Sequence, residues 1–211
     1  MYSMYTERPS FVMGFHGCDL SVRDKVVMNQ LVMKKSENDY DWLGHGIYFW
    51  ENNEERAFQF ACEQVVRKKV STPAVLGAFI DLGNCLDLLN SKYLQLLKTV
   101  GYPDVVESAK ASGLPMLKNS PANNSGDLIL RWLDCAVIEA LHQIYEDNGF
   151  QPFDSVRGVF WEGDDLYPGA GMKEKNHIQI CIRNLDCIKG FFIPRKMLAQ
   201  YKKNGKDIEK Y

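Results

Sequence analysis

The pattern of hydrophobic and polar positions divides the chain into a first group of strands, a middle block of helix and a second group of strands. Short apolar runs bounded by turn residues, and strictly alternating runs, are typical of strands. Such runs predict strands over residues 11–18, 43–50 (a strand or tight loop), 72–88, 155–162, 177–183 and 187–194. This order predicts an α+β fold with mostly antiparallel strands rather than a doubly wound sheet.

Apolar positions at helical spacing predict two helices among the first strands. One covers residues 21–34, with Ser21 as its N-cap. The other covers residues 54–69 and is capped by Asn52 or Asn53.

From about residue 88 to 150 the pattern changes to helix. The strongest helical segment is "RWLDCAVIEALHQIYED", residues 131–147, in which His142 is interpreted as structural. A chain of 211 residues fits a single domain. We therefore predict one domain over residues 1–211 with a mainly helical insertion at about 88–150.

Composition and charge limit the classes of function. The chain is 45% hydrophobic and 25% charged, as in ordinary globular proteins. Its formal net charge of −2 gives no general attraction to nucleic acid or anionic lipid. The N-terminus lacks the apolar core of a signal peptide, and no apolar run reaches membrane-spanning length. These features predict a cytoplasmic protein that does not associate with membranes.

The six cysteines are scattered and form no CxxC pair. In a reducing cytoplasm this spacing predicts buried thiols rather than disulfides or a zinc site. No metal is expected.

Two short motifs place glycine beside histidine and aromatic residues. "FHG" at 15–17 puts His16 at a strand end, directly before Gly17, and "LGHGIYF" at 43–49 puts two glycines before Tyr48. Glycine weakens a strand unless the backbone bends or is closely approached. The motifs therefore predict a close approach to the backbone near aromatic rings. Taken singly, His16 is equally compatible with a structural role, and a tyrosine such as Tyr48 is more often a core residue than a ligand platform.

A third motif, "NHIQICIR" at 176–183, alternates strictly. One side of this predicted strand carries isoleucines. The other side carries His177, Gln179, Cys181 and Arg183. Such a polar face lines a cleft or faces solvent.

Together, and in this order, the three motifs resemble the ADP-ribosyltransferases, particularly the branch shared by diphtheria toxin and the poly(ADP-ribose) polymerases. That family has a His-Gly pair on an early strand, a "GIYF"-like stretch after it and a late strand with a catalytic glutamate. The resemblance spans most of the chain but is carried by these short motifs and their spacing. It implies a mostly antiparallel split sheet with a helical insertion, and NAD as the substrate.

The resemblance also implies which residues contact NAD. The main chain of Gly17 would bind the nicotinamide carboxamide, while the cationic ring lies against Tyr48 in the space left by the glycines. His16 would bind an adenosine ribose hydroxyl. The implied NAD-binding set is His16, Gly17, Gly46, Tyr48, and Phe58 or Phe60 from the following helix, with Trp50 as a further aromatic candidate.

One position departs from the family pattern. Gln179 stands where the family glutamate would align, and an amide can bind a ribose hydroxyl but supplies no charge. Glu174, in the loop 162–176 where the family places target recognition, is the candidate substitute. The implied catalytic residues are thus His16, Tyr48, Gln179 and Glu174, and the missing glutamate favours mono-transfer over polymer synthesis.

The predicted function is a mono-ADP-ribosyltransferase that cleaves NAD and modifies a macromolecular acceptor, either protein or nucleic acid. By resemblance to compact bacterial proteins, it would act as an intracellular toxin or phage-defence effector restrained by an antitoxin protein. Two alternatives stay open: an NAD glycohydrolase, and a non-catalytic module that binds NAD or ADP-ribose.

Overall fold

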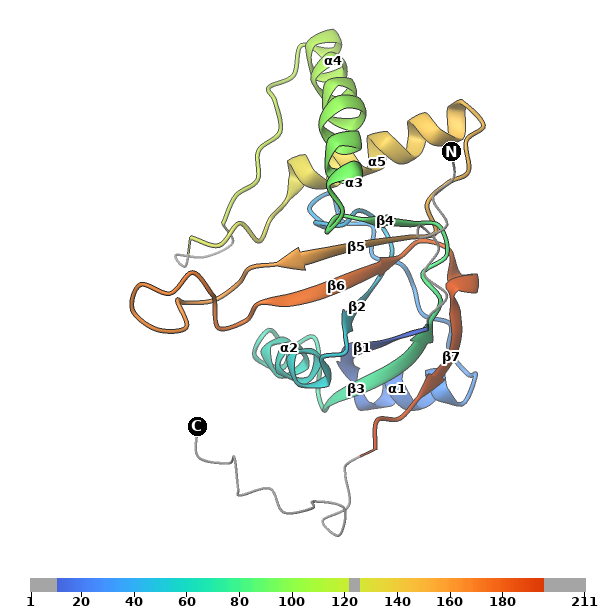
Figure 1. Cartoon of the computed structure of the whole chain (residues 1–211). Helices are drawn as coiled ribbons and strands as arrows, with labels where there is room; N and C mark the ends of the chain where they lie inside the picture. The colour runs from blue at the N-terminus through green and yellow to red at the C-terminus, as the bar shows by residue number, and fades with distance from the viewer. Residues whose placement is uncertain (1–10, 122–125, 196–211) are drawn as a thin grey trace.

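The computed structural model describes residues 11–121 and 126–195. Its framework is a single seven-stranded sheet (Figure 1). The strands are β1 (Val12–Asp19), β2 (Ile47–Glu51), β3 (Pro73–Ile80), β4 (Cys85–Asp87), β5 (Ser155–Phe160), β6 (His177–Ile182) and β7 (Ile188–Phe192). They lie in the order β4-β5-β6-β2-β1-β3-β7, and only the β4–β5 pair is parallel. The predicted α+β class with mostly antiparallel strands is confirmed.

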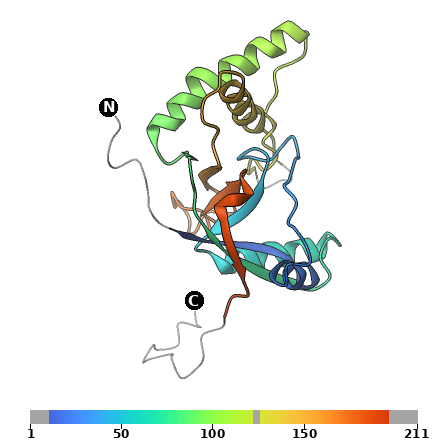
Figure 2. The same cartoon turned by 90° about the vertical axis from the view of Figure 1, so that its right-hand side faces the viewer.

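The helices fall into two groups. The first group is α1 (Leu20–Val27) and α2 (Glu54–Val66), and the second is α3 (Ser91–Leu96), α4 (Tyr102–Ser112) and α5 (Trp132–Asp147). A π-helical turn, η1 (Leu97–Gly101), joins α3 to α4, and a 3-10 turn, η2 (Leu185–Cys187), precedes β7. The chain from α3 to α5 lies between β4 and β5 in sequence, where the helical block was predicted. Figure 2 shows this block at one end of the molecule and α1 and α2 at the other.

The N-terminus of α1 differs from the prediction. Asp19, not Ser21, is the N-cap: its carboxylate accepts hydrogen bonds from the amide and hydroxyl of Ser21, at 2.9 and 2.7 Å. A hydrogen bond from the amide of Thr72, together with the two from Ser21 and one from the amide of Ser71, holds the pKa of Asp19 below its usual range. The helix then ends at Val27 because its last turn leads into Met28 and a left-handed Asn29, so the predicted extent to residue 34 was too long.

The cap of α2 is Asn53, one of the two predicted residues. Its side-chain oxygen accepts from the amide of Arg56 at 2.9 Å. The helix ends at Val66, shortly before Lys68 adopts a left-handed φ of 58°.

Helices α1 and α2 cover opposite faces of β1. Cys18 packs with Val26 of α1, whereas its neighbour Gly17 faces Ala57 of α2. Successive residues of a strand point to opposite faces, so the two helices sandwich this part of the sheet.

Helices α2 and α5 share one face of the sheet. On β2, Trp50 packs in the cluster that contains Ala57 of α2, and Tyr48, two residues earlier, packs against the cluster that contains Ile138 of α5. The part of the sheet between α2 and α5 is the setting of the candidate site.

Candidate functional site

Strand β2 is bonded differently along its two edges. Toward β6 it forms four residue pairs, from Ile47 opposite Ile182 to Trp50 opposite Gln179. Toward β1 it forms two pairs, and the last of them joins Phe15 to Trp50. Beyond Phe15 the β1–β2 pairing opens, at the two residues that the sequence motifs single out, Gly17 and Tyr48.

The main chain of Gly17 is directed into this opening. The carbonyl of Met13 accepts a hydrogen bond from the amide of Asn52 at 2.9 Å, so it points to the β2 side. Main-chain groups of alternate residues in a strand point to the same side. The N–H and C=O of Gly17 therefore face the β2 side at a position where the β1–β2 ladder has ended.

His16 bridges the opening with its side chain. Its ring Nδ1 lies 2.8 Å from the carbonyl oxygen of Tyr48, which fixes Nδ1 as the donor because a carbonyl only accepts. Burial lowers the pKa of the imidazole, which favours the neutral ring with an unprotonated Nε2. Because His16 and Gly17 are successive residues of β1, the imidazole lies on the face of the sheet opposite α2. It packs edge-on against Phe49, with a centroid distance of 5.8 Å.

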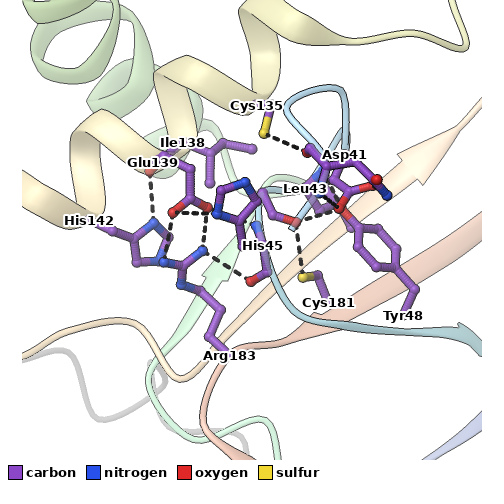
Figure 3. A network of polar contacts seen from close by, with 12 residues as sticks. Asp41, Leu43, His45, Tyr48, Cys135, Ile138, Glu139, His142, Cys181 and Arg183 are labelled. Carbon is purple, nitrogen blue, oxygen red and sulfur yellow. Dashed lines mark hydrogen bonds and ion pairs between the residues drawn. The ribbon is translucent and has the colours of Figure 1, made fainter. Parts of the chain in front are cut away.

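The side chain of Tyr48 is turned toward the protein. Its hydroxyl donates to the carbonyl of Gly44 at 2.8 Å and accepts from the amide of Leu43 at 3.0 Å (Figure 3). Burial raises the pKa of this phenol. The hydroxyl thus fastens the "LGHG" loop, and the half-buried ring packs against the α5 cluster.

The same loop is tied to α5 by a polar network (Figure 3). Glu139 of α5 forms a two-point ion pair with Arg183, at 2.5 and 3.0 Å, and accepts from the main-chain N–H of His45 at 2.8 Å. Burial opposes ionisation of Glu139, but its bonds to Arg183 and His45 lower the carboxyl pKa overall. Glu139 therefore stays charged and holds the loop in place.

The protein itself fills the space beside the motif glycines. A Cβ on Gly17 would lie 2.1 Å from the carbonyl oxygen of Ala57, and one on Gly46 would lie 2.5 Å from the sulfur of Cys181. The sequence interpretation placed a ligand ring in this space. Helix α2 and strand β6 occupy it instead, so packing alone explains both glycines.

Gln179 lies between β2 and β5 on the face shared by α2 and α5. It pairs with Trp50 on one side and Gly158 on the other and is 9% exposed. Its Oε1 accepts a hydrogen bond from the indole Nε1 of Trp42 at 2.7 Å. Sequence reasoning missed Trp42, because it lies in a polar turn segment with no pattern of its own.

Buried polar atoms gather beside Gln179. The rings of Trp50 and His177 lie 6.0 Å apart, and the guanidinium of Arg56 lies over the Trp50 ring at 5.7 Å. In the described part of the chain, Trp50 Nε1, His177 Nε2 and Arg56 Nε have no hydrogen-bond partner. Burial lowers the pKa of His177, whose Nδ1 bonds the carbonyl of Lys175 at 2.6 Å, so its Nε2 is an acceptor.

The two aromatic candidates on α2 occupy different environments. Phe60 packs against Trp50 with a centroid distance of 5.0 Å. Phe58 is 45% exposed and is absent from the core cluster formed there. Of the pair, Phe60 is the ring beside the aromatic cluster.

Glu174 and Gln179 have different surroundings. It is exposed and lines a hollow of about 490 Å³ between the end of α2 and the loop 162–176. Glu63 and Glu162 line the same hollow and pair with Arg56 beneath it, at 3.4 and 2.8 Å. Neither this hollow nor a second one, about 620 Å³ beside α3 and α5, is lined by His16, Tyr48 or Gln179.

Comparisons with protein-family models, curated proteins and solved structures find no match to this chain. Among residues 11–121 and 126–195, no group of three or more His, Cys, Asp or Glu side chains is arranged to hold a metal ion. Within the same ranges, no helix has the length and apolar character needed to cross a membrane.

Proposed function

We propose that this chain binds NAD at the opening between β1 and β2 and transfers ADP-ribose to a macromolecular acceptor. The observation that carries the proposal is the early end of the β1–β2 ladder, with Gly17 on one side, Tyr48 on the other and His16 bonded across it. The resemblance of the three sequence motifs to ADP-ribosyltransferases supports the same position.

Each group at the opening has a chemistry suited to NAD. The N–H and C=O of Gly17, which face the opening beyond the end of the β1–β2 ladder, form a donor–acceptor pair that matches the carboxamide of nicotinamide. The Nε2 of neutral His16 accepts a hydrogen bond, as a ribose hydroxyl requires. Neither interaction needs the space beside the glycine Cα atoms that α2 and β6 fill.

The chemistry is displacement at the nicotinamide ribose. The bond from C1 of the ribose to the ring nitrogen breaks, and its electron pair neutralises the pyridinium of departing nicotinamide. The acceptor's lone pair then forms the new bond to C1, and the acceptor's proton passes to solvent. As in glycoside hydrolysis, the transition state resembles an oxocarbenium ion, and the protein contributes mainly by holding the two ends.

The loop 162–176 is the candidate acceptor surface. It is folded back on itself by a bridge between Asp165 and Lys173, whose side chains pair at 2.8 Å. Its tip exposes Leu166 and Tyr167, at 51% and 55%. Exposed apolar and aromatic side chains on an ordered loop are suited to contact with a second macromolecule.

A non-catalytic NAD or ADP-ribose binding module is the second candidate, and one observation favours it. Gln179 is neutral, and its partners on the neighbouring strands, Trp50 and Gly158, supply no carboxylate. A site without negative charge near C1 has less means to stabilise an oxocarbenium ion.

Incubation with NAD separates the candidates. A transferase releases nicotinamide and moves label from the ADP-ribose half to protein or nucleic acid in a cell extract. A glycohydrolase releases nicotinamide without labelling a macromolecule, and a binding module shows saturable binding by calorimetry with neither reaction. Absence of both binding and turnover contradicts the proposed site.

Paired variants of His16 link the reaction to the opening. His16→Asn keeps a side-chain N–H for the Tyr48 carbonyl but removes the Nε2 acceptor, whereas His16→Ala removes both. We expect both variants to weaken NAD binding about tenfold, the effect of one hydrogen bond, and only His16→Ala to lower the thermal midpoint. Unchanged NAD binding in both variants would remove His16 from the site.

A further inference from the structure

We propose that Trp42 is a positioning residue that fixes the side-chain amide of Gln179 so that its NH2 group, rather than its carbonyl oxygen, is presented to a ligand. The orientation of a glutamine amide is ordinarily ambiguous. Here the partner removes the ambiguity. An indole nitrogen only donates, so the atom 2.7 Å from Trp42 Nε1 is the carbonyl oxygen of Gln179.

The surroundings of Trp42 hold its ring at this position. A Cβ on Gly158 would lie 2.8 Å from Cη2 of the Trp42 ring, so the ring occupies a slot that exists because residue 158 has no side chain. The ring also packs on Phe160 at a centroid distance of 4.9 Å. Gly158 is the residue paired with Gln179 across β5 and β6, which places the indole directly over the neighbouring strand.

The orientation of the amide determines which ligand atoms Gln179 can recognise. Its role in the reaction rests on the proposed NAD site. With Oε1 engaged, the amide offers two N–H donors and is suited to an acceptor atom such as a ribose oxygen. A carboxylate at the same place would accept a proton or hydrogen bond instead. Gln179 therefore orients the ribose without acting as a base, which agrees with a reaction that does not activate a ribose hydroxyl as the next acceptor.

The bond itself can be measured without NAD. In ¹⁵N spectra, each of the four tryptophans gives one indole signal, and assignment by Trp42→Phe identifies that of Trp42. We expect Gln179→Leu to speed hydrogen exchange at this indole about tenfold, the effect of one lost hydrogen bond. Gln179→Glu, whose carboxylate also accepts, should retain the protection. Equal exchange in wild type and Gln179→Leu would overturn the proposal.

The effect on the site is measured by a double-mutant cycle. Trp42→Phe keeps an aromatic ring in the Gly158 slot and loses only the donor. We expect Trp42→Phe to weaken NAD binding or nicotinamide release several-fold, and to add nothing in a Gln179→Leu background. Trp132→Phe is the matched control. Trp132, the first residue of α5, packs on Tyr40 near Trp42 with a distance of 6.1 Å between ring centroids, and it does not bond Gln179.

The two measurements keep this inference separate from the proposed function. If no variant binds NAD, the proposed function fails, and indole exchange still decides whether Trp42 holds Gln179. If NAD binds and the effects of Trp42→Phe and Gln179→Leu are additive, the two side chains act independently, and the positioning role is wrong.

Discussion

The two edges of β2 show how one short strand serves two purposes. Toward β6 four of the five residues of the strand are paired, and the residues before it are fastened by Tyr48, Glu139 and Arg183. Toward β1 the pairing stops after two residues, and a histidine side chain replaces the ladder. The closed edge therefore supplies rigidity, and the open edge leaves the main-chain groups of Gly17 outside the β1–β2 ladder.

The glycines of the two motifs belong to this comparison. Gly46 allows β6 to approach at the closed edge, and Gly17 allows α2 to approach β1 beside the open edge. Both requirements are packing requirements. What distinguishes the open edge is the direction of the main-chain groups of Gly17, and glycine itself is no evidence for that.

The largest effect is expected at the closed edge. Gly46→Ala would place a Cβ 2.5 Å from the Cys181 sulfur and 2.6 Å from the carbonyl oxygen of Ile182, so strand pairing must shift. We expect the free energy of unfolding, measured by urea denaturation, to fall by about 3 kcal/mol. Gly190→Ala, where no atom lies within 4 Å of the added Cβ, should change it by less than about 0.5 kcal/mol. Similar losses in both variants would mean that β6 does not constrain Gly46.

The next effect is expected in the pH dependence of the free energy of unfolding. It involves α5, the helix that fastens the loop beside the closed edge. Burial lowers the pKa of His142 on α5 to about 4, whereas an unfolded histidine titrates near 6.5. As the pH falls from about 6.5 to about 4, the unfolded chain takes up a proton that the folded chain refuses, so stability is lost, by up to about 3 kcal/mol. His142→Phe should flatten the free energy of unfolding over this range. Parallel pH curves for variant and wild type would show that His142 does not contribute.

The smallest effect is expected from the hydroxyl that holds the loop beside the closed edge. Tyr48→Phe leaves the amide of Leu43 and the carbonyl of Gly44 without the phenol, at a cost of about 1–2 kcal/mol in the free energy of unfolding. NAD binding should change little, because the hydroxyl faces the protein. A loss of binding larger than the loss of stability would place the hydroxyl in the site and weaken the contrast between the edges. Tyr48→Ala is a poorer test of function, because removing the packed ring also disturbs the α5 cluster.

Local patterns in the sequence were sufficient for most of the fold. Strict alternation predicted β6, the clear amphipathic pattern predicted α5, and Asn53 was identified as one of two possible caps for α2. The predicted N-cap of α1 was wrong because Asp19, the last residue of the preceding strand, accepts from Ser21 and from the distant Ser71 and Thr72. A cap stabilised by residues some fifty positions away cannot be identified from local spacing.

The sequence revealed less of the candidate site than of the fold. The motifs directed attention to His16, Gly17 and Tyr48, which the structure brings together at the β1–β2 opening. They gave no indication of Trp42, whose bond to Gln179 joins positions 137 residues apart. They also did not separate Phe58 from Phe60, because one helix carries both and only the packing of Trp50 decides which ring lies inside.

The sequence by itself determined the α+β class and the helical block between the strands, because periodicity and turn chemistry act over a few residues. It pointed to His16, Gly17 and Tyr48 only through the resemblance of short motifs to a family. Tertiary structure alone decided that the β1–β2 ladder opens, that α2 and β6 fill the space beside the glycines, and that the indole of Trp42 donates to the amide oxygen of Gln179. Those features depend on which distant segments lie side by side, and strand register sets that through packing of the whole sheet rather than through any local pattern.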